Sequence, residues 1–109
     1  MAADVINAIH TIYSDEDFNR LTYCNMAGHA RALVDVHGMS VSAAMRFINN
    51  LINLVCAMMQ YSFQLTVIHG FNHGTSLQKM VRHDLDNVHI KERITDDRNP
   101  GITRLVISR

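Results

Sequence analysis

The sequence is poor in the residue types that mark many specialised classes of protein. Its 109 residues include no tryptophan, one proline and two cysteines, and ten basic residues balance ten acidic ones. This zero net charge excludes a protein that grips long stretches of nucleic acid by charge alone, so any such contact must be local or helped by histidine protonation. Cys24 and Cys56 form no CxxC pair, which predicts reduced thiols and a cytoplasmic protein.

The sequence also contains little that resembles a targeting or membrane-spanning segment. No lysine or arginine precedes Arg20, and no long apolar run lies near the start, which argues against a signal peptide. The most apolar segment, 41–59, is interrupted by Arg46 and three asparagines, so we interpret it as a core helix. A hydrophobic fraction of 48% with 18% charged residues predicts one globular domain.

Hydrophobic periodicity predicts strands that alternate with helices, after a helical N-terminal extension over residues 1–28. Ser14 and Asp17 form a potential capping box for a short helix that runs through Leu21. The domain that follows, 29–109, has the order β-α-β-α-β-β, which favours an α/β two-layer sandwich with a mixed sheet and right-handed crossovers. The predicted strands are 32–36, 63–68, 88–94 and 102–108, the last two forming a potential hairpin, and the predicted helices are 41–59 and a second one from Thr75, with Leu77, Met80, Val81 and Leu85 facing inward.

Two His-Gly dipeptides, each at the end of a predicted strand, are the most informative pattern. Residues 33–38 read Leu-Val-Asp-Val-His-Gly, and residues 65–70 read Leu-Thr-Val-Ile-His-Gly. In open α/β sheets, ligands bind beyond the carboxyl ends of the parallel strands. We therefore expect His37 and His69 to lie on one rim of the sheet, around a small group such as a phosphate.

Asp35 lies two residues before His37, so the two side chains are expected on the same side of the strand. The carboxylate can then set the tautomer and orientation of the imidazole, which is a common way to build a general acid or base near neutral pH. The alternative is a carboxylate that only accepts hydrogen bonds from backbone amides at the end of the strand.

The segment from His69 to Gly74 reads His-Gly-Phe-Asn-His-Gly and predicts a turn from strand to helix. Its glycines and asparagine tolerate positive φ, and such a turn can direct successive N–H groups at an anion. Many turns of this composition only reverse the chain, and that alternative stays open. The predicted phosphate or nucleic-acid ligands are Gly70, Asn72, His73, Gly74, Thr75, Lys79 and Arg82.

A metal site is a further alternative at the same place. His69 and His73 are four residues apart, and His37 or Asp35 would supply a third ligand. Because Gly70 interrupts the segment, the two histidines do not form the pair that one helix presents to a metal. We therefore assign no metal ligands, and a divalent metal ion stays open as a cofactor.

These motifs resemble the signatures of the Smr (small MutS-related) domain family. Residues 34–38, Val-Asp-Val-His-Gly, are similar to its Leu-Asp-Leu-His-Gly signature, and residues 69–74 are similar to its His-Gly-x-Gly-x-Gly signature. Residues 100–107 resemble the last strand of that domain. The resemblance covers about residues 30–109. It implies an α/β sandwich similar to the C-terminal domain of translation initiation factor 3, nucleic-acid binding and, in several members, an endonuclease that nicks DNA or cuts RNA.

Individual residues of this sequence match positions in the two signatures. Asp35 and His37 match the acid and the imidazole of the first signature, and His69, Gly70 and Gly74 match the second. This sequence departs from the family at two places. Asn72 replaces the middle glycine of the second signature, and Gln78 stands where an arginine often follows the turn.

Three functions are compatible with these residues. The first is an endonuclease acting on DNA or RNA, in which Asp35 orients His37 as general base or acid and His69 is its complement. The second is a non-catalytic module that binds structured nucleic acid or a ribonucleoprotein, which the zero net charge and the missing arginine favour. The third is a metal-dependent hydrolase of small phosphoesters that uses His37, His69 and His73. A nucleic acid rather than a membrane is the expected partner, and the oligomeric state stays open.

Overall fold

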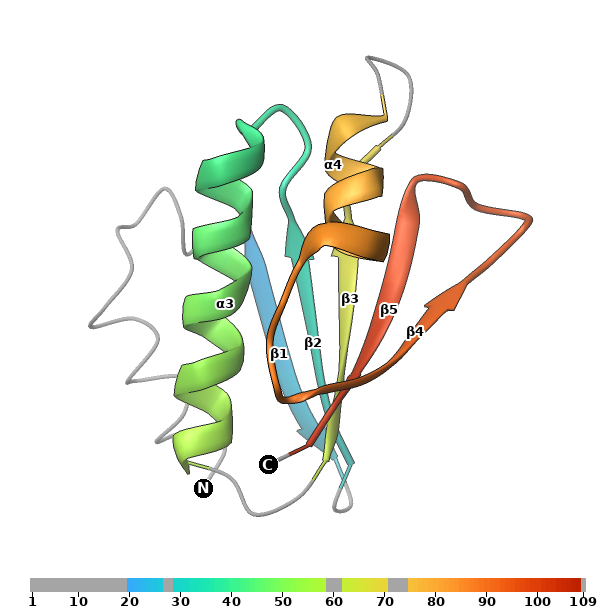
Figure 1. Cartoon of the computed structure of the whole chain (residues 1–109). Coiled ribbons are helices and arrows are strands. Elements are labelled where there is room, and N and C mark those ends of the chain that lie inside the picture. The colour runs from blue at the N-terminus through green and yellow to red at the C-terminus, as the bar shows by residue number, and fades with distance from the viewer. Residues whose placement is uncertain (1–19, 27–28, 59–61, 71–74, 109) are drawn as a thin grey trace.

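The computed structural model describes residues 20–26, 29–58, 62–70 and 75–108 (Figure 1). A five-stranded sheet has the order β1-β2-β3-β5-β4, and Figure 1 shows the helices packed on one of its faces. The elements in chain order are β1 (Leu21–Met26), β2 (His29–Asp35), α3 (Val41–Met58), β3 (Phe63–Ile68), α4 (Ser76–Lys79), the π-helix η1 (Met80–Asp84), β4 (Ile90–Thr95) and β5 (Ile102–Ile107).

The pairing of the strands confirms the predicted α/β fold class with a mixed sheet. β2 and β3 are parallel, and α3 forms the crossover between them. β5 runs antiparallel to both β3 and β4, so the predicted hairpin of the last two strands is present. The parallel pair therefore brings the carboxyl ends of β2 and β3 to the same rim of the sheet, as we expected from the two His-Gly dipeptides.

The segment before β2 corrects one expectation. Residues 21–26 were expected to continue a helix, but they form β1, an edge strand antiparallel to β2 with Leu21 opposite Val34 and Met26 opposite His29. The prediction of a helix is wrong here because pairing with β2 satisfies the backbone groups of this segment, and β-favouring residues such as Thr22 suit that place. The sheet thus begins before residue 29, while the predicted helices within residues 1–19 lie outside the described residues.

The core lies between α3 and the sheet. Seven residues of α3, spaced as one helical stripe, are buried together with strand residues such as Val34, Leu65 and Leu105. Full burial of each aliphatic side chain of this size contributes about 1.5–3 kcal/mol. By length and composition alone α3 could also cross a membrane, but here its apolar stripe covers the sheet.

The second helix is short and changes its geometry. α4 continues into η1, where the Leu85 N–H donates to the Met80 carbonyl at 2.7 Å across five residues. Met80, Val81 and Leu85 are fully buried, as predicted. This element therefore covers the part of the sheet next to α3.

Strand alternation gives the sheet two chemically different faces. On the helix side, the side chains of Val34, Val67 and Thr103 are fully buried. We call the opposite side the outer face. It is formed by residues that alternate with the buried ones and are exposed or half-buried, among them Arg31, Leu33, Asp35, Gln64, Thr66 and Arg104.

Candidate functional site

Asp35 and His37 form a pair where β2 ends, on the outer face of the sheet. His37 Nδ1 is hydrogen-bonded to Asp35 Oδ1, and the His37 backbone N–H donates to the same oxygen at 3.1 Å. The His37 side chain is 67% exposed and that of Asp35 is 34% exposed. Because an ionised carboxylate only accepts hydrogen bonds, Nδ1 carries the proton and Nε2 is the basic nitrogen of the neutral ring. The structure thus shows the contact that the two-residue spacing predicts.

Arg20, which sequence reasoning missed, holds the backbone of this pair. Its Nη1 donates to the carbonyl oxygens of Asp35, at 3.0 Å, and His37, at 3.3 Å. The Asp35 N–H in turn donates to the Arg20 carbonyl at 2.9 Å. No local signal marks Arg20, because its position depends on the pairing of β1 with β2. Arg20 therefore fixes the end of β2 and places a positive charge beside the site.

His69 follows β3 on the same rim, but on the helix side of the sheet. Only 3% of it is exposed. Its Nδ1 is hydrogen-bonded to the Gly70 carbonyl at 2.8 Å, and its Nε2 to Thr103 Oγ1 at 2.9 Å. The prediction of one shared rim is confirmed, yet His37 and His69 project to opposite faces. His69 therefore does not share an open site with His37.

The partners of His69 fix its tautomer. Arg82 Nε donates to Thr103 Oγ1 at 2.8 Å, so the Thr103 hydroxyl accepts from Arg82 and donates its own proton to His69 Nε2. His69 Nδ1–H then donates to the Gly70 carbonyl. Burial is the main cause that lowers the pKa of His69, the charge of Arg82 adds to it, and the bond to Gly70 opposes it. His69 is therefore neutral at pH 7, at the end of a hydrogen-bonded chain that starts at Arg82.

Gly70 connects the two histidines. Its φ of +71° lies in the left-handed region, and a Cβ at this position would be 3.7 Å from the His37 Cβ. Its N–H donates to the Gly101 carbonyl at 3.1 Å, so this amide is engaged within the protein. The hydrogen bond from His69 to the Gly70 carbonyl thus fixes the backbone that lies next to His37.

The remaining predicted phosphate ligands are spread over different places. Thr75 and Lys79 are exposed at the two ends of α4. Arg82 is turned into the protein, because its Nη2 also donates to the carbonyl of Ile102 at 3.2 Å. Gln78, at the position of the expected arginine, donates to the Pro100 carbonyl at 2.8 Å. Three further predicted ligands lie outside the described residues: Asn72, His73 and Gly74.

One ligand of the metal alternative, His73, lies outside the described residues. Among residues 20–26, 29–58, 62–70 and 75–108, no group of three or more His, Cys, Asp or Glu side chains is placed to hold a metal ion. Both ring nitrogens of His69 are already hydrogen-bonded within the protein. His69 therefore does not fit the role of a metal ligand without a change of its ring contacts.

Comparison with known proteins supports the same fold. No family model and no curated protein sequence matches this chain. Among solved structures, it is similar to the Smr domain of MutS2 from Thermus thermophilus, with a TM-score of 0.60 and 18% sequence identity. The similarity covers 71% of this chain and 98% of that domain. The chain therefore has the fold of an Smr domain, as the two His-Gly signatures predicted.

Proposed function

We propose that this domain binds nucleic acid and that His37, oriented by Asp35, cleaves a phosphodiester bond in it. The observation that carries the proposal is the contact of His37 Nδ1 with Asp35 Oδ1 at the carboxyl end of a parallel strand. Ligands bind at this end of strands in open α/β sheets. The Smr fold and the resemblance of residues 34–38 and 69–74 to the Smr signatures support a nucleic acid as the ligand.

The chemistry follows from the tautomer of His37. With Nδ1–H donated to Asp35, Nε2 can remove the proton from an attacking hydroxyl group as that oxygen forms a bond to phosphorus. The bond from phosphorus to the leaving oxygen breaks, and this oxygen takes a proton from the imidazolium or from solvent. Asp35 stabilises the imidazolium while it exists, because the carboxylate carries the opposite charge.

His69 acts as a positioning residue in this proposal. Its predicted role as the complementary acid or base stays a prediction, but a buried, neutral ring with both nitrogens bonded to Gly70 and Thr103 favours a different task. That task is to fix the Gly70 backbone against His37.

A second function, binding without cleavage, is favoured by one observation. Gln78 and Arg82 occupy the part of the chain where a phosphate-binding arginine is expected, and both donate to the Pro100 carbonyl, at 2.8 and 3.4 Å. Arg82 and the side chain at the position of the expected arginine are thus engaged within the protein, whereas Lys79 is exposed.

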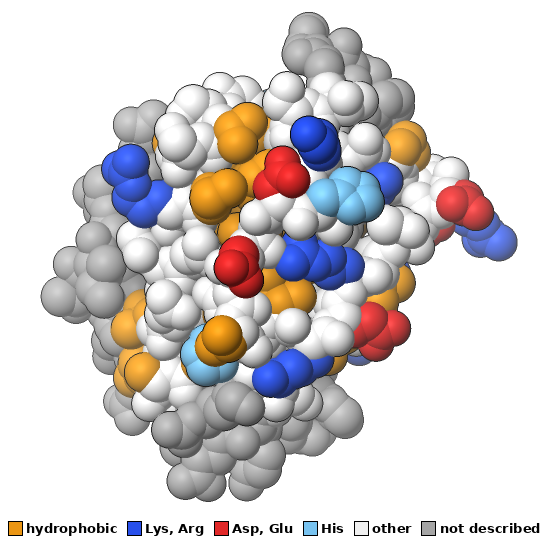
Figure 2. Space-filling view, in the orientation of Figure 1, with side chains coloured by type: hydrophobic (Ala, Val, Ile, Leu, Met, Phe, Trp, Pro, Cys, Tyr) orange, Lys and Arg blue, Asp and Glu red, His pale blue; other side chains and the backbone are white. Residues whose placement is uncertain are grey.

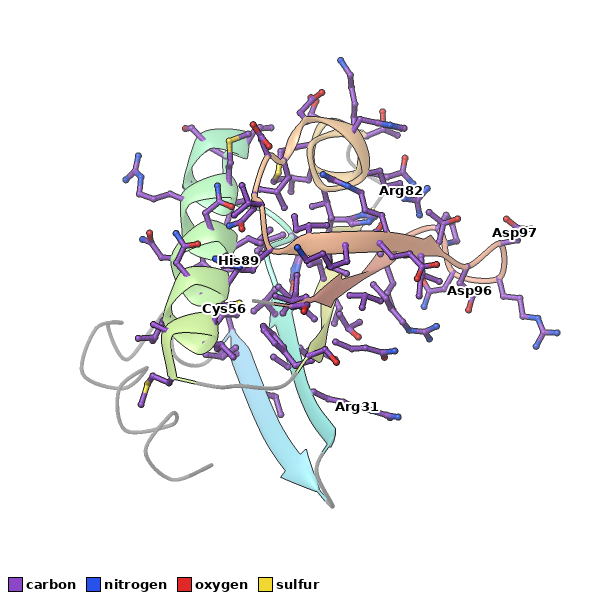
Figure 3. All side chains as sticks on the ribbon, turned by 60° about the horizontal axis from the view of Figure 1, so that its bottom comes forward. Arg31, Cys56, Arg82, His89, Asp96 and Asp97 are labelled. Carbon is purple, nitrogen blue, oxygen red and sulfur yellow. The ribbon has the colours of Figure 1, made fainter. Side chains whose placement is uncertain are left out.

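The experiment measures binding and cleavage together at low salt. Supercoiled plasmid and a structured RNA are incubated with the wild-type protein and with Asp35→Asn. The control is Asp97→Asn, which makes the same change at the exposed tip of the β4–β5 hairpin (Figure 3). We expect Asp35→Asn to slow cleavage by about 100-fold or more while binding is retained, and the control to change neither.

The outcomes separate the two functions. Equal cleavage by the wild type and Asp35→Asn would contradict the assigned chemistry. Binding without any cleavage would establish the non-catalytic function instead. No binding to either nucleic acid at low salt would overturn both.

A further inference from the structure

We propose that a single strand of nucleic acid lies along the outer face of the sheet, where Arg31 and Arg104 contact its phosphates. This inference rests on the proposed function and adds the surface and the form of the ligand. It differs from the expectation that Lys79 and Arg82, on the helix side, make these contacts.

The strand register joins the site and the two arginines into one surface. Asp35 is opposite Ile68 on β3, and two residues earlier Leu33 is opposite Thr66. Thr66 is in turn opposite Arg104 on β5. Each set of opposite residues forms a row across the strands. These rows follow one another along the outer face, starting at the end of β2, where His37 lies.

Arg31 lies one row further along the same face. It is opposite Gln64 on β3, and Figure 3 shows its side chain extending from β2 away from α3. With neighbouring strands about 4.8 Å apart and a rise of about 3.3 Å per residue, the Cα atoms of Arg31 and Arg104 are about 12 Å apart. One short strand can therefore contact both arginines and the site.

The side chains of this face suit the chemistry of a nucleic-acid strand. Arg31, Gln64 and Arg104 are exposed, and guanidinium groups bind phosphate oxygens through paired N–H donors. The exposed carboxylate of Glu92 on β4 belongs to the same face, so the proposed surface is the part that β2, β3 and β5 form. Leu33 is 37% exposed and Thr66 is half-buried between it and Arg104. The face thus offers cations for phosphates beside an aliphatic and hydroxyl surface for sugars and bases, as flat sheet surfaces do in several single-strand binders.

The helix side offers a poorer surface. Arg82 is hydrogen-bonded to Thr103, which leaves its guanidinium directed into the protein. Figure 2 shows basic and acidic side chains intermingled on this side, without a continuous basic area. His37 and Asp35 stand on the other side of the sheet. A nucleic-acid strand that binds at His37 therefore continues onto the outer face.

The test compares the removal of two charges on the outer face with the removal of two charges elsewhere. Binding of fluorescent oligo(dT) and oligo(U) of about 15 nucleotides, a length within the range for single-strand sites, is measured by anisotropy at several salt concentrations. The outer-face variant is Arg31→Gln with Arg104→Gln. The control is Arg46→Gln with Arg98→Gln, which removes two exposed charges that lie off the outer face, on α3 and in the loop between β4 and β5. Thermal unfolding checks that both variants are folded.

We expect the outer-face variant to bind at least about 10-fold more weakly and to lose about 1.4 from the slope of log K against log salt, since each phosphate contact contributes about 0.7. The control should keep the wild-type slope. Equal effects of the two variants, or a larger effect of the control, would overturn the outer-face surface while the proposed function stands.

Three further outcomes also count against the inference. Tighter binding of a duplex than of either oligonucleotide would overturn the single strand as ligand. A dimer in sedimentation that the outer-face substitutions abolish would make the face a contact between two copies. Absence of binding by the wild-type protein to single strands, duplex and structured RNA would remove the proposed function itself.

Discussion

The two histidines of the His-Gly dipeptides show how the same short sequence can serve two purposes. His37 is exposed and paired with the carboxylate of Asp35, whereas His69 is buried and bonded to Gly70 and Thr103. Both follow parallel neighbouring strands on one rim. The direction of the two strands brings both histidines to the same rim. The face of the sheet on which each side chain lies then decides its hydrogen-bond partners and its exposure.

The face of each histidine follows from its distance to a buried strand residue. His69 comes two residues after buried Val67, so it continues on the helix side. His37 comes one residue after buried Val36 and two after Asp35, so it lies on the outer face. A shift of one position in the spacing between strand and histidine therefore separates an exposed imidazole from a buried one.

The largest expected effect is a contrast between the two histidine variants: one should lose cleavage and the other should lose stability. We expect His37→Ala to slow cleavage by about 10²–10⁴-fold with little change in the urea midpoint, because the side chain is exposed. His69→Ala should instead lower the free energy of unfolding by about 3 kcal/mol, through the cavity and the unpaired groups that it leaves. Cleavage rates and urea unfolding of both variants check this. Equal loss of stability in both would remove the contrast.

The next effect is a loss of stability when the hydrogen bonds that link Arg82, Thr103 and His69 are broken. Thr103→Val keeps the shape of the side chain but leaves His69 Nε2 and Arg82 Nε without their shared partner. We expect a loss of about 1–3 kcal/mol in the free energy of unfolding. The matched control is Thr95→Val, an exposed residue opposite Thr103 on β4, which should change stability little. Similar unfolding curves for both variants would contradict the proposed role of the hydroxyl.

A smaller effect tests the proximity of Gly70, which follows β3, to His37, which follows β2. Gly38 and Gly70 both have positive φ, +80° and +71°, so alanine at either position should cost about 1–2 kcal/mol in stability. Only Gly70→Ala places a methyl group against His37, 3.7 Å from its Cβ. We therefore expect Gly70→Ala to reduce cleavage more than Gly38→Ala at equal stability. A greater reduction by Gly38→Ala would place the sensitive backbone elsewhere.

The smallest effect is a dependence of stability on pH. Since burial holds the pKa of folded His69 below the ordinary value near 6.5, the unfolded chain binds a proton there that the folded protein does not. The contribution of neutral His69 is thus complete above pH 6.5 and decreases as the pH falls, by at most about 1.4 kcal/mol per pH unit. Urea unfolding between about pH 5 and 8 should show this slope in the wild type and a smaller one in His69→Gln. Equal slopes would contradict the buried, neutral state.

Local patterns in the sequence predicted much of the fold. The apolar stripe from Val41 and the run Phe63–Ile68 correspond to α3 and β3, because helical and strand periodicities depend on neighbouring residues. The spacing of Asp35 and His37 is local in the same sense, and their contact follows from it. The His-Gly signatures also predicted the Smr fold.

The tertiary structure decided what depends on residues far apart in the chain. β1 is a strand because β2 lies beside it, and Arg20 reaches His37 only through that pairing. The hydrogen bonds that fix His69 involve Arg82 on η1 and Thr103 on β5, and the bond to Thr103 spans 34 residues. By itself, the sequence determined which groups come to the rim of the sheet. Only the packing of α4 and η1 over one face decided which of the two histidines stays exposed, because burial depends on long-range contacts that no local pattern records.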